Sequence, residues 1–209
     1  MLIMAKRVVW KKNDLVNIQL RDNLYTIGQM LTSPEMRFYD IFNSDGAWQN
    51  LDLNKIEPLF SVFVGNVINK SLIQGKIKST TVIPSSKPNE RYWIKPYTIL
   101  DYGHYKGDRF NFHFLGGKLI DLVPDADGIL STTRAPIIKE DLTIPQDRKL
   151  IEQYELTNMW GDVDLRDRLC RYFDTGINRD DLKFEVFPGL WDDREKLRPL
   201  TRRLPEPLR

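Results

Sequence analysis

The start of the chain spaces its hydrophobic side chains as β-strands do. Val16, Ile18 and Leu20 alternate with polar residues, a period of two that predicts a strand with one solvent-facing side. Residues 21–23 supply turn chemistry, and a second apolar run covers residues 24–31. We therefore expect a hairpin at the beginning of the fold.

Two further strands are expected in this part of the sequence. Residues 36–42 form a third run after a break at residues 33–35, and a turn at residues 43–46 leads to Trp48. The run over residues 59–68 is too apolar for an exposed edge, so we expect it at the centre of the sheet. Four strands in close succession predict a strongly bent antiparallel sheet or a small, partly open barrel.

The middle of the chain mixes strand signals with turn residues. Residues 85–89 are Ser, Ser, Lys, Pro and Asn, which predict a mobile loop within residues 79–91. Residues 110–114 alternate aromatic with polar side chains and predict another strand. The glycine pair at residues 116–117 is expected to turn the chain there.

The last third changes from strand spacing to helix spacing. Apolar residues between 147 and 154 suit a short helix. A clearer amphipathic helix is expected over residues 163–173, with Asp162 as its cap and Gly176 as its left-handed exit. Residues 183–187 alternate again and predict a final strand, so the expected fold class is α+β.

Small, polar and proline residues from 124 to 145 indicate a long connector. We accordingly expect a β-rich domain over residues 1–123, and a connector with an α+β subdomain over residues 124–209. One continuous domain is the alternative. The sequence leaves the oligomeric state open.

Composition narrows the classes of protein that fit. The chain has 209 residues, 41% hydrophobic and 29% charged, which argues against a largely disordered chain and against a membrane protein. Its 31 basic and 29 acidic residues leave a net charge of +2, so we expect no strong general attraction to nucleic acid or anionic membranes. A single cysteine, with neither a secretory signal nor a spanning segment, predicts a cytoplasmic protein.

The residue types that most often carry catalysis or bind metals are few. His104, His113 and Cys170 show no metal-ligand spacing, and a thiol on the apolar side of the expected helix is normally a packing residue. His113 lies between two aromatic residues, which fits the polar face of a strand or part of a binding surface. We expect no catalytic residue, no metal site and no cofactor.

Three other motifs lack what their chemistry requires. Residues 125–128 begin like a calcium loop, but Arg134 stands where the bidentate Glu belongs. Residues 116–118 lack the glycine spacing and the hydroxyl of a phosphate loop. The acid pairs at 180–181 and 192–193 lie beside turn residues, so we expect them to be solvated rather than catalytic.

Two stretches carry residue types that are able to contact nucleic acid. Residues 92–114 are rich in aromatics and lie among Arg91, Lys95, Lys106 and Arg109, a mixture that suits base stacking or a core with a charged reverse face. The second stretch is the basic end of the chain, whose positive side chains suit phosphate contacts. It consists of Arg194, Lys196, Arg198, Arg202, Arg203 and Arg209, and Glu195 and Glu206 reduce its net positive charge.

The strand pattern of the first half resembles the bacterial immunity protein 26 family. The segments that carry the resemblance are residues 14–20 (DLVNIQL), 24–31 (LYTIGQML), 36–42 (MRFYDIF) and 59–64 (LFSVFV). Members of that family are antidotes in polymorphic toxin and contact-dependent growth inhibition systems. The resemblance therefore implies an immunity protein that binds and neutralises one cognate toxin domain in the cytoplasm, one to one.

Such a role needs no enzymatic chemistry, and the resemblance implies that the partner is a protein rather than a membrane or a nucleic acid. An antidote covers a toxin surface through a few central anchors, and Trp48, Trp93, Tyr105 and Trp191 have the appropriate side chains. The sequence does not separate exposed from buried aromatics, so it assigns no binding residue. A nucleic-acid-binding accessory protein is the alternative function, followed by a hydrolase.

Overall fold

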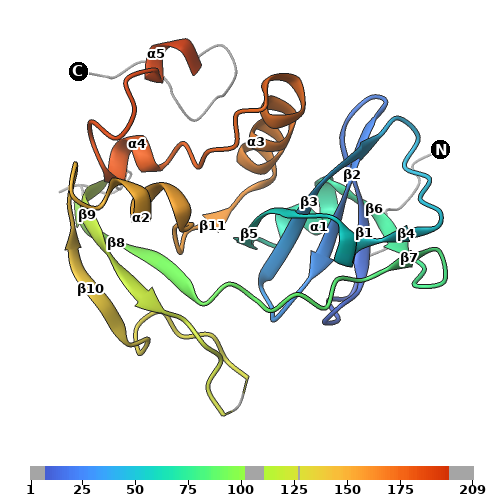
Figure 1. The fold of residues 1–209 in the computed structure, drawn as a ribbon, viewed down its shortest axis with the longest axis horizontal. Coiled ribbons are helices and arrows are strands. Elements are labelled where there is room, and N and C mark those ends of the chain that lie inside the picture. The colour runs from blue at the N-terminus through green and yellow to red at the C-terminus, as the bar shows by residue number, and fades with distance from the viewer. Residues whose placement is uncertain (1–7, 102–110, 127, 198–209) are drawn as a thin grey trace, which may run out of the picture. The chain divides into compact units, whose positions relative to one another are not determined.

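The structure, a computed structural model, describes residues 8–101, 111–126 and 128–197 (Figure 1). Among these residues the chain divides into two compact units. Unit 1 consists of residues 8–90 and 158–179, and unit 2 of residues 91–157 and 180–197. The divisions lie at other points than the expected boundary after residue 123, because part of the expected connector pairs with a strand of unit 2.

Unit 1 is built on a curled, six-stranded half-barrel sheet, as the bent-sheet prediction required. The predicted hairpin is confirmed, with Val16 opposite Gly28 in antiparallel register. In spatial order the strands are β11 (Met159–Trp160), β5 (Pro58–Val64), β3 (Glu35–Asn43), β2 (Leu24–Met30), β1 (Leu15–Arg21) and β6 (Ile73–Ile77).

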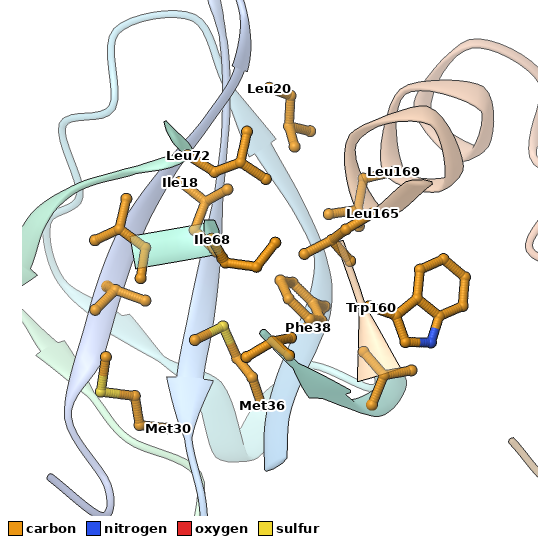
Figure 2. Close-up of a cluster of buried hydrophobic side chains, with 14 of the residues drawn as sticks. Ile18, Leu20, Met30, Met36, Phe38, Ile68, Leu72, Trp160, Leu165 and Leu169 are labelled. Carbon is orange, nitrogen blue, oxygen red and sulfur yellow. The ribbon is translucent and has the colours of Figure 1, made fainter. Parts of the chain in front are cut away.

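The main core of unit 1 lies between one face of this sheet and two helices, α1 (Val67–Ser71) and α3 (Asp162–Thr175). Figure 2 shows Leu165 and Leu169 of α3 pointing toward the strand residue Phe38. On its other side the sheet adjoins β4 (Leu51–Asp52), the 3-10 helix η1 (Leu53–Lys55) and β7 (Val82–Ile83), with a second apolar cluster.

The apolar run at residues 59–68 was expected to be one central strand, and this is wrong in two respects. Strand β5 ends at Val64, and Ile68 lies in α1, where it is buried in the core. The neighbours of β5 are β3 and the two-residue β11, so β5 lies beside the sheet's edge strand. Its apolar character comes from packing under α3 instead.

Helix α3 confirms the amphipathic prediction for residues 163–173 and the left-handed exit at Gly176, where φ is 74°. The predicted cap is wrong, because Gly161 occupies the cap position and Asp162 begins the first turn. An acidic side chain there still faces the positive end of the helix dipole.

Unit 2 combines a three-stranded antiparallel sheet with short helices. The sheet order is β10 (Ile137–Leu142), β9 (Asn111–Asp121) and β8 (Tyr92–Asp101). Helices α2 (Arg148–Gln153) and α4 (Lys183–Val186) lie on one side of it (Figure 1) and share its core, and α5 (Arg194–Leu197) follows. Helix α2 confirms the short helix predicted between 147 and 154.

Three sequence expectations are wrong in unit 2. The glycines at 116–117 do not turn the chain, because β9 continues through them to Asp121 with an irregular register. The connector predicted from 124 to 145 contains β10, which pairs with β9. The residues predicted as a strand at 183–187 form helix α4 instead. Polar and apolar side chains are both buried there, so the alternating polarity does not distinguish a buried side from a solvent-facing side.

Candidate partner-binding surface

The sheet of unit 2 has two faces with different surroundings. One face carries the cross-strand pair Ile94 and Leu119, which is buried in the core. Farther along the strands, Ile99 of β8 lies opposite His113 of β9. Ile99 is 53% exposed. Leu115, two residues beyond His113, is 61% exposed. Large aliphatic side chains are therefore open to solvent on strands whose other residues build a core.

A β-bulge accounts for the exposure of Leu115. Thr98 pairs with Phe114 and Pro96 with Gly117, so two residues of β9, Leu115 and Gly116, stand opposite one residue of β8. Gly116 has a φ of 85°, a backbone conformation that favours glycine. The extra residue shifts the register and leaves Leu115 outside the regular cross-strand packing.

A small polar cluster borders these side chains. The Tyr97 hydroxyl donates to the Glu140 carboxylate over 2.5 Å, and the Lys118 ammonium lies 5.5 Å from the Tyr97 ring centre. Lys118 Nζ is 3.9 Å from Glu140 Oε2. The hydrogen bond to Glu140 raises the pKa of Tyr97 to about 12, so the phenol stays protonated and its donor is fixed in direction.

We define the β8–β10 surface as this exposed apolar pair with the groups around it. Apolar side chains framed by polar and charged groups are the usual composition of a protein-binding surface. Its residues are Tyr97, Ile99, His113, Leu115, Lys118 and Glu140.

Strand β10 adds a sheet edge with its own protection. Ile137 and Ile138 are exposed on it, and most of its remaining side chains are charged. Its pairing with β9 is irregular, and Asp141 has a φ of 45°. Charges and bulges of this kind oppose strand addition from another chain. The edge of β10 is therefore poorly suited to pairing with a strand of another chain.

The residues considered from sequence are scattered across the structure. His113 belongs to the β8–β10 surface, while Cys170 lies half-buried on α3 in unit 1. Burial is the main cause that raises the pKa of the Cys170 thiol, which agrees with a packing role. His104 lies outside the described residues. Among those described, no group of three or more His, Cys, Asp or Glu side chains is arranged to hold a metal ion.

The aromatic anchors proposed from sequence differ in accessibility. Trp48 and Trp93 are buried, so neither is available as it stands for a partner. Trp191 is half-buried, and its Nε1 donates to Glu152 over 3.1 Å. Tyr105 lies outside the described residues. The sequence reasoning missed Ile99 and Leu115, since exposed aliphatic residues look like core residues in a sequence.

The acid pairs also differ from expectation in one case. Asp180 and Asp181 were expected to be solvated, but both are buried. Asp180 Oδ1 accepts from the backbone N–H of Leu182 over 3.0 Å, which holds the start of α4. Asp192 is exposed, as expected for that pair, and Asp193 is half-buried.

Two candidate nucleic-acid contacts, Arg91 and Lys95, are engaged in contacts within unit 2. Arg91 forms an ion pair with Asp121, and Lys95 Nζ donates to the carbonyl of Thr132 over 3.1 Å. Lys106 and Arg109 lie outside the described residues, as does the basic chain end from residue 198 onward. No helix in the described parts of the chain is long and apolar enough to cross a membrane.

Comparison with known families gives one match. A family model described as a domain of unknown function, DUF8309, covers residues 5–192. The chain belongs to the DUF8309 family. No curated protein and no solved structure matches this DUF8309 chain. The match spans both units, so the DUF8309 domain includes the half-barrel and the sheet that carries the β8–β10 surface.

Proposed function

We propose that the protein is an immunity protein that binds and neutralises a cognate bacterial toxin domain in the cytoplasm, by contact and without chemistry of its own. The observation that carries this proposal is the pair of exposed aliphatic side chains, Ile99 and Leu115, on the β8–β10 surface. The resemblance of residues 14–64 to immunity protein 26 strands supplies the class of partner.

The energetics of the surface fit a protein partner. Fully burying a leucine or isoleucine side chain contributes roughly 1.5–3 kcal/mol. Ile99 and Leu115 are about half exposed, so covering each would contribute roughly 1–2 kcal/mol. Tyr97, Lys118 and Glu140 supply directional polar contacts around them, which discriminate between related partners more than they add affinity.

Co-expression with a toxin domain encoded by a neighbouring gene, where the genome has one, tests the proposal. The chain should protect cells from that toxin and leave them sensitive to unrelated toxins. A toxin that acts catalytically must be almost completely titrated, so we expect a one-to-one complex with a Kd of about 1 nM or tighter. Protection without any measurable complex, lost in His113→Ala, would instead indicate enzymatic action.

Variants locate the contact. Ile99→Ala and Leu115→Ala should each weaken the complex about tenfold, the equivalent of about 1.4 kcal/mol. Ile83→Ala is the matched control, because Ile83 is 54% exposed on β7 of unit 1. Full affinity in both surface variants would place the interface elsewhere, and salt-dependent binding to nucleic acid without a toxin complex would favour the accessory-protein alternative.

A further inference from the structure

Strand β3 buries a row of polar side chains on the face of the half-barrel opposite the main core. Glu35, Arg37 and Tyr39 are two residues apart and therefore share a face, while Met36 and Phe38 between them enter the core. All three polar residues are buried, with Glu35 only 2% exposed. Buried polar side chains need hydrogen-bond partners, and here residues 85–89 provide several of them.

We call residues 85–89 the strap. Arg37 donates from Nη1 to the Lys87 carbonyl over 2.9 Å and from Nη2 to the Pro88 carbonyl over 2.5 Å. Asn89 Nδ2 donates to Glu35 Oε2 over 3.0 Å. The strap thus runs along β3, fastened by side chains, where the sequence predicted a mobile loop.

The other end of the strap is held through Gln29 of β2. Gln29 Nε2 donates to the Ser85 carbonyl over 2.9 Å, and the Ser85 N–H donates to Gln29 Oε1 over 3.1 Å. Tyr39 also donates its hydroxyl to Gln29 Oε1. The amide of Gln29 is therefore oriented by Tyr39 and used on both sides of one strap residue.

Glu35 is the exception in this satisfied network. Its second oxygen, Oε1, is buried and has no hydrogen-bond partner among the described residues. Arg37 is near enough to favour the carboxylate, but its guanidinium directs donors to the strap carbonyls and, over 3.4 Å, to Ser61 Oγ. A carboxylate in this position has lost water and gained one amide donor in return.

The charged groups around Glu35 come from three elements. Arg37 on β3 and Lys12 before β1 favour ionisation, and Glu90 next to the strap opposes it. Phe63, which lies opposite Glu35 on β5, brings no charge. Burial outweighs the favourable charges and raises the pKa of Glu35 to about 7.

We propose that the strap is a proton-controlled latch, closed over β3 while Glu35 is protonated and released when Glu35 ionises. Ionisation creates a buried negative charge on Glu35, which water would hydrate if the side chain were exposed. Moving Asn89 away lets water reach this carboxylate. Release would uncover the donors of Arg37 and Gln29 that now bind strap carbonyls. This device is independent of the proposed toxin contact.

Hydrogen exchange of the strap amides, read by mass spectrometry or NMR, tests the latch. The reporters are the N–H groups of Ser85 and Ser86, which donate to Gln29 and Asn54. If Glu35 is fully hydrated when the strap is open, the equilibrium constant for opening of the strap should rise about 70-fold from about pH 5 to about pH 8. Glu35→Gln cannot ionise and should lose this rise.

The ratio of exchange rates between wild type and variant at each pH removes the intrinsic pH dependence of exchange. Glu57→Gln is the matched control, because Glu57 is 89% exposed and pairs with the strap residue Lys87. It should keep the wild-type rise. The amide of Met30, at the end of β2, donates to the carbonyl of Asp14 just before β1 and serves as the reporter of global unfolding, so its exchange should not follow the strap.

A second variant covers the case in which Glu35→Gln folds poorly. Asn89→Ala removes the side chain that contacts Glu35 and should speed strap exchange even at about pH 5, with the Met30 amide still protected. The latch is overturned if wild type and Glu35→Gln show the same pH dependence in the strap. It is also overturned if strap and Met30 amides accelerate together, because the opening is then global.

Discussion

Replacing Glu35 with glutamine should change how the stability of unit 1 depends on pH. The substitution keeps the shape of the side chain and its acceptor for Asn89, but removes the ionisable proton. In the folded protein the pKa of Glu35 is about 7, raised from an ordinary value of 4.5 mainly by burial. In the unfolded chain the same group ionises near that ordinary value.

The sign follows from comparing the two states. Above the unfolded pKa the unfolded chain releases a proton that the folded protein retains, so stability falls as pH rises toward the folded pKa. The difference between these two pKa values corresponds to about 3 kcal/mol, reached above about pH 7. Opening of the strap exposes the carboxylate to water at a lower free-energy cost than global unfolding does. The value is therefore an upper limit on the change in the free energy of global unfolding.

Urea unfolding followed by tryptophan fluorescence measures the effect. From about pH 5 to about pH 8, the unfolding free energy of Glu35→Gln should rise relative to that of the wild type by roughly 2–3 kcal/mol. Glu57→Gln, at an exposed position, should run parallel to wild type. Parallel curves for Glu35→Gln as well would mean that Glu35 is ionised at ordinary cost, and the reasoning from burial would fail.

Two further substitutions test packing in unit 1 by the same unfolding measurement. A Cβ at Gly28 would lie 2.7 and 2.8 Å from buried side-chain atoms, so Gly28→Ala should cost about 1–3 kcal/mol, whereas Gly75→Ala, with nothing within 4 Å, should change stability little. The Arg168 guanidinium lies 3.8 Å from the Phe60 ring centre. Arg168→Lys should therefore lower the free energy of unfolding by about 1–2 kcal/mol, because lysine has no planar group to stack on the ring. An unfolding free energy equal to that of the wild type would contradict this.

The strands of the half-barrel were predictable because their alternation is local. Val16, Ile18 and Leu20 face one core, and no distant residue is needed to decide this. Strand β10 was missed for the opposite reason. Five of its six side chains are exposed, so burial imposes no period on residues 137–142. Its strand character comes from pairing with β9, which a local pattern does not show.

Helix α4 and the β8–β10 surface depend on tertiary information. Lys183 is as buried as Phe184, so the alternating polarity of residues 183–187 reports no solvent-facing side. Ile99 and Leu115 were assigned to no surface, because a sequence shows that a side chain is apolar but not whether another element covers it. The glycines at 116–117 gave a usable signal, since glycine inside a strand pattern also indicates a bulge.

The two sheets depart from ordinary burial in opposite directions. On β3 of unit 1, Glu35 is enclosed with one oxygen unsatisfied, although an apolar side chain would be buried there at no such cost. On the sheet of unit 2, Ile99 and Leu115 remain in water, although polar side chains would suit that position better. Burial alone favours neither choice. Positions where a sequence departs from the local rule without a gain in stability are where function is expected, which directs experiments to the strap and to the β8–β10 surface.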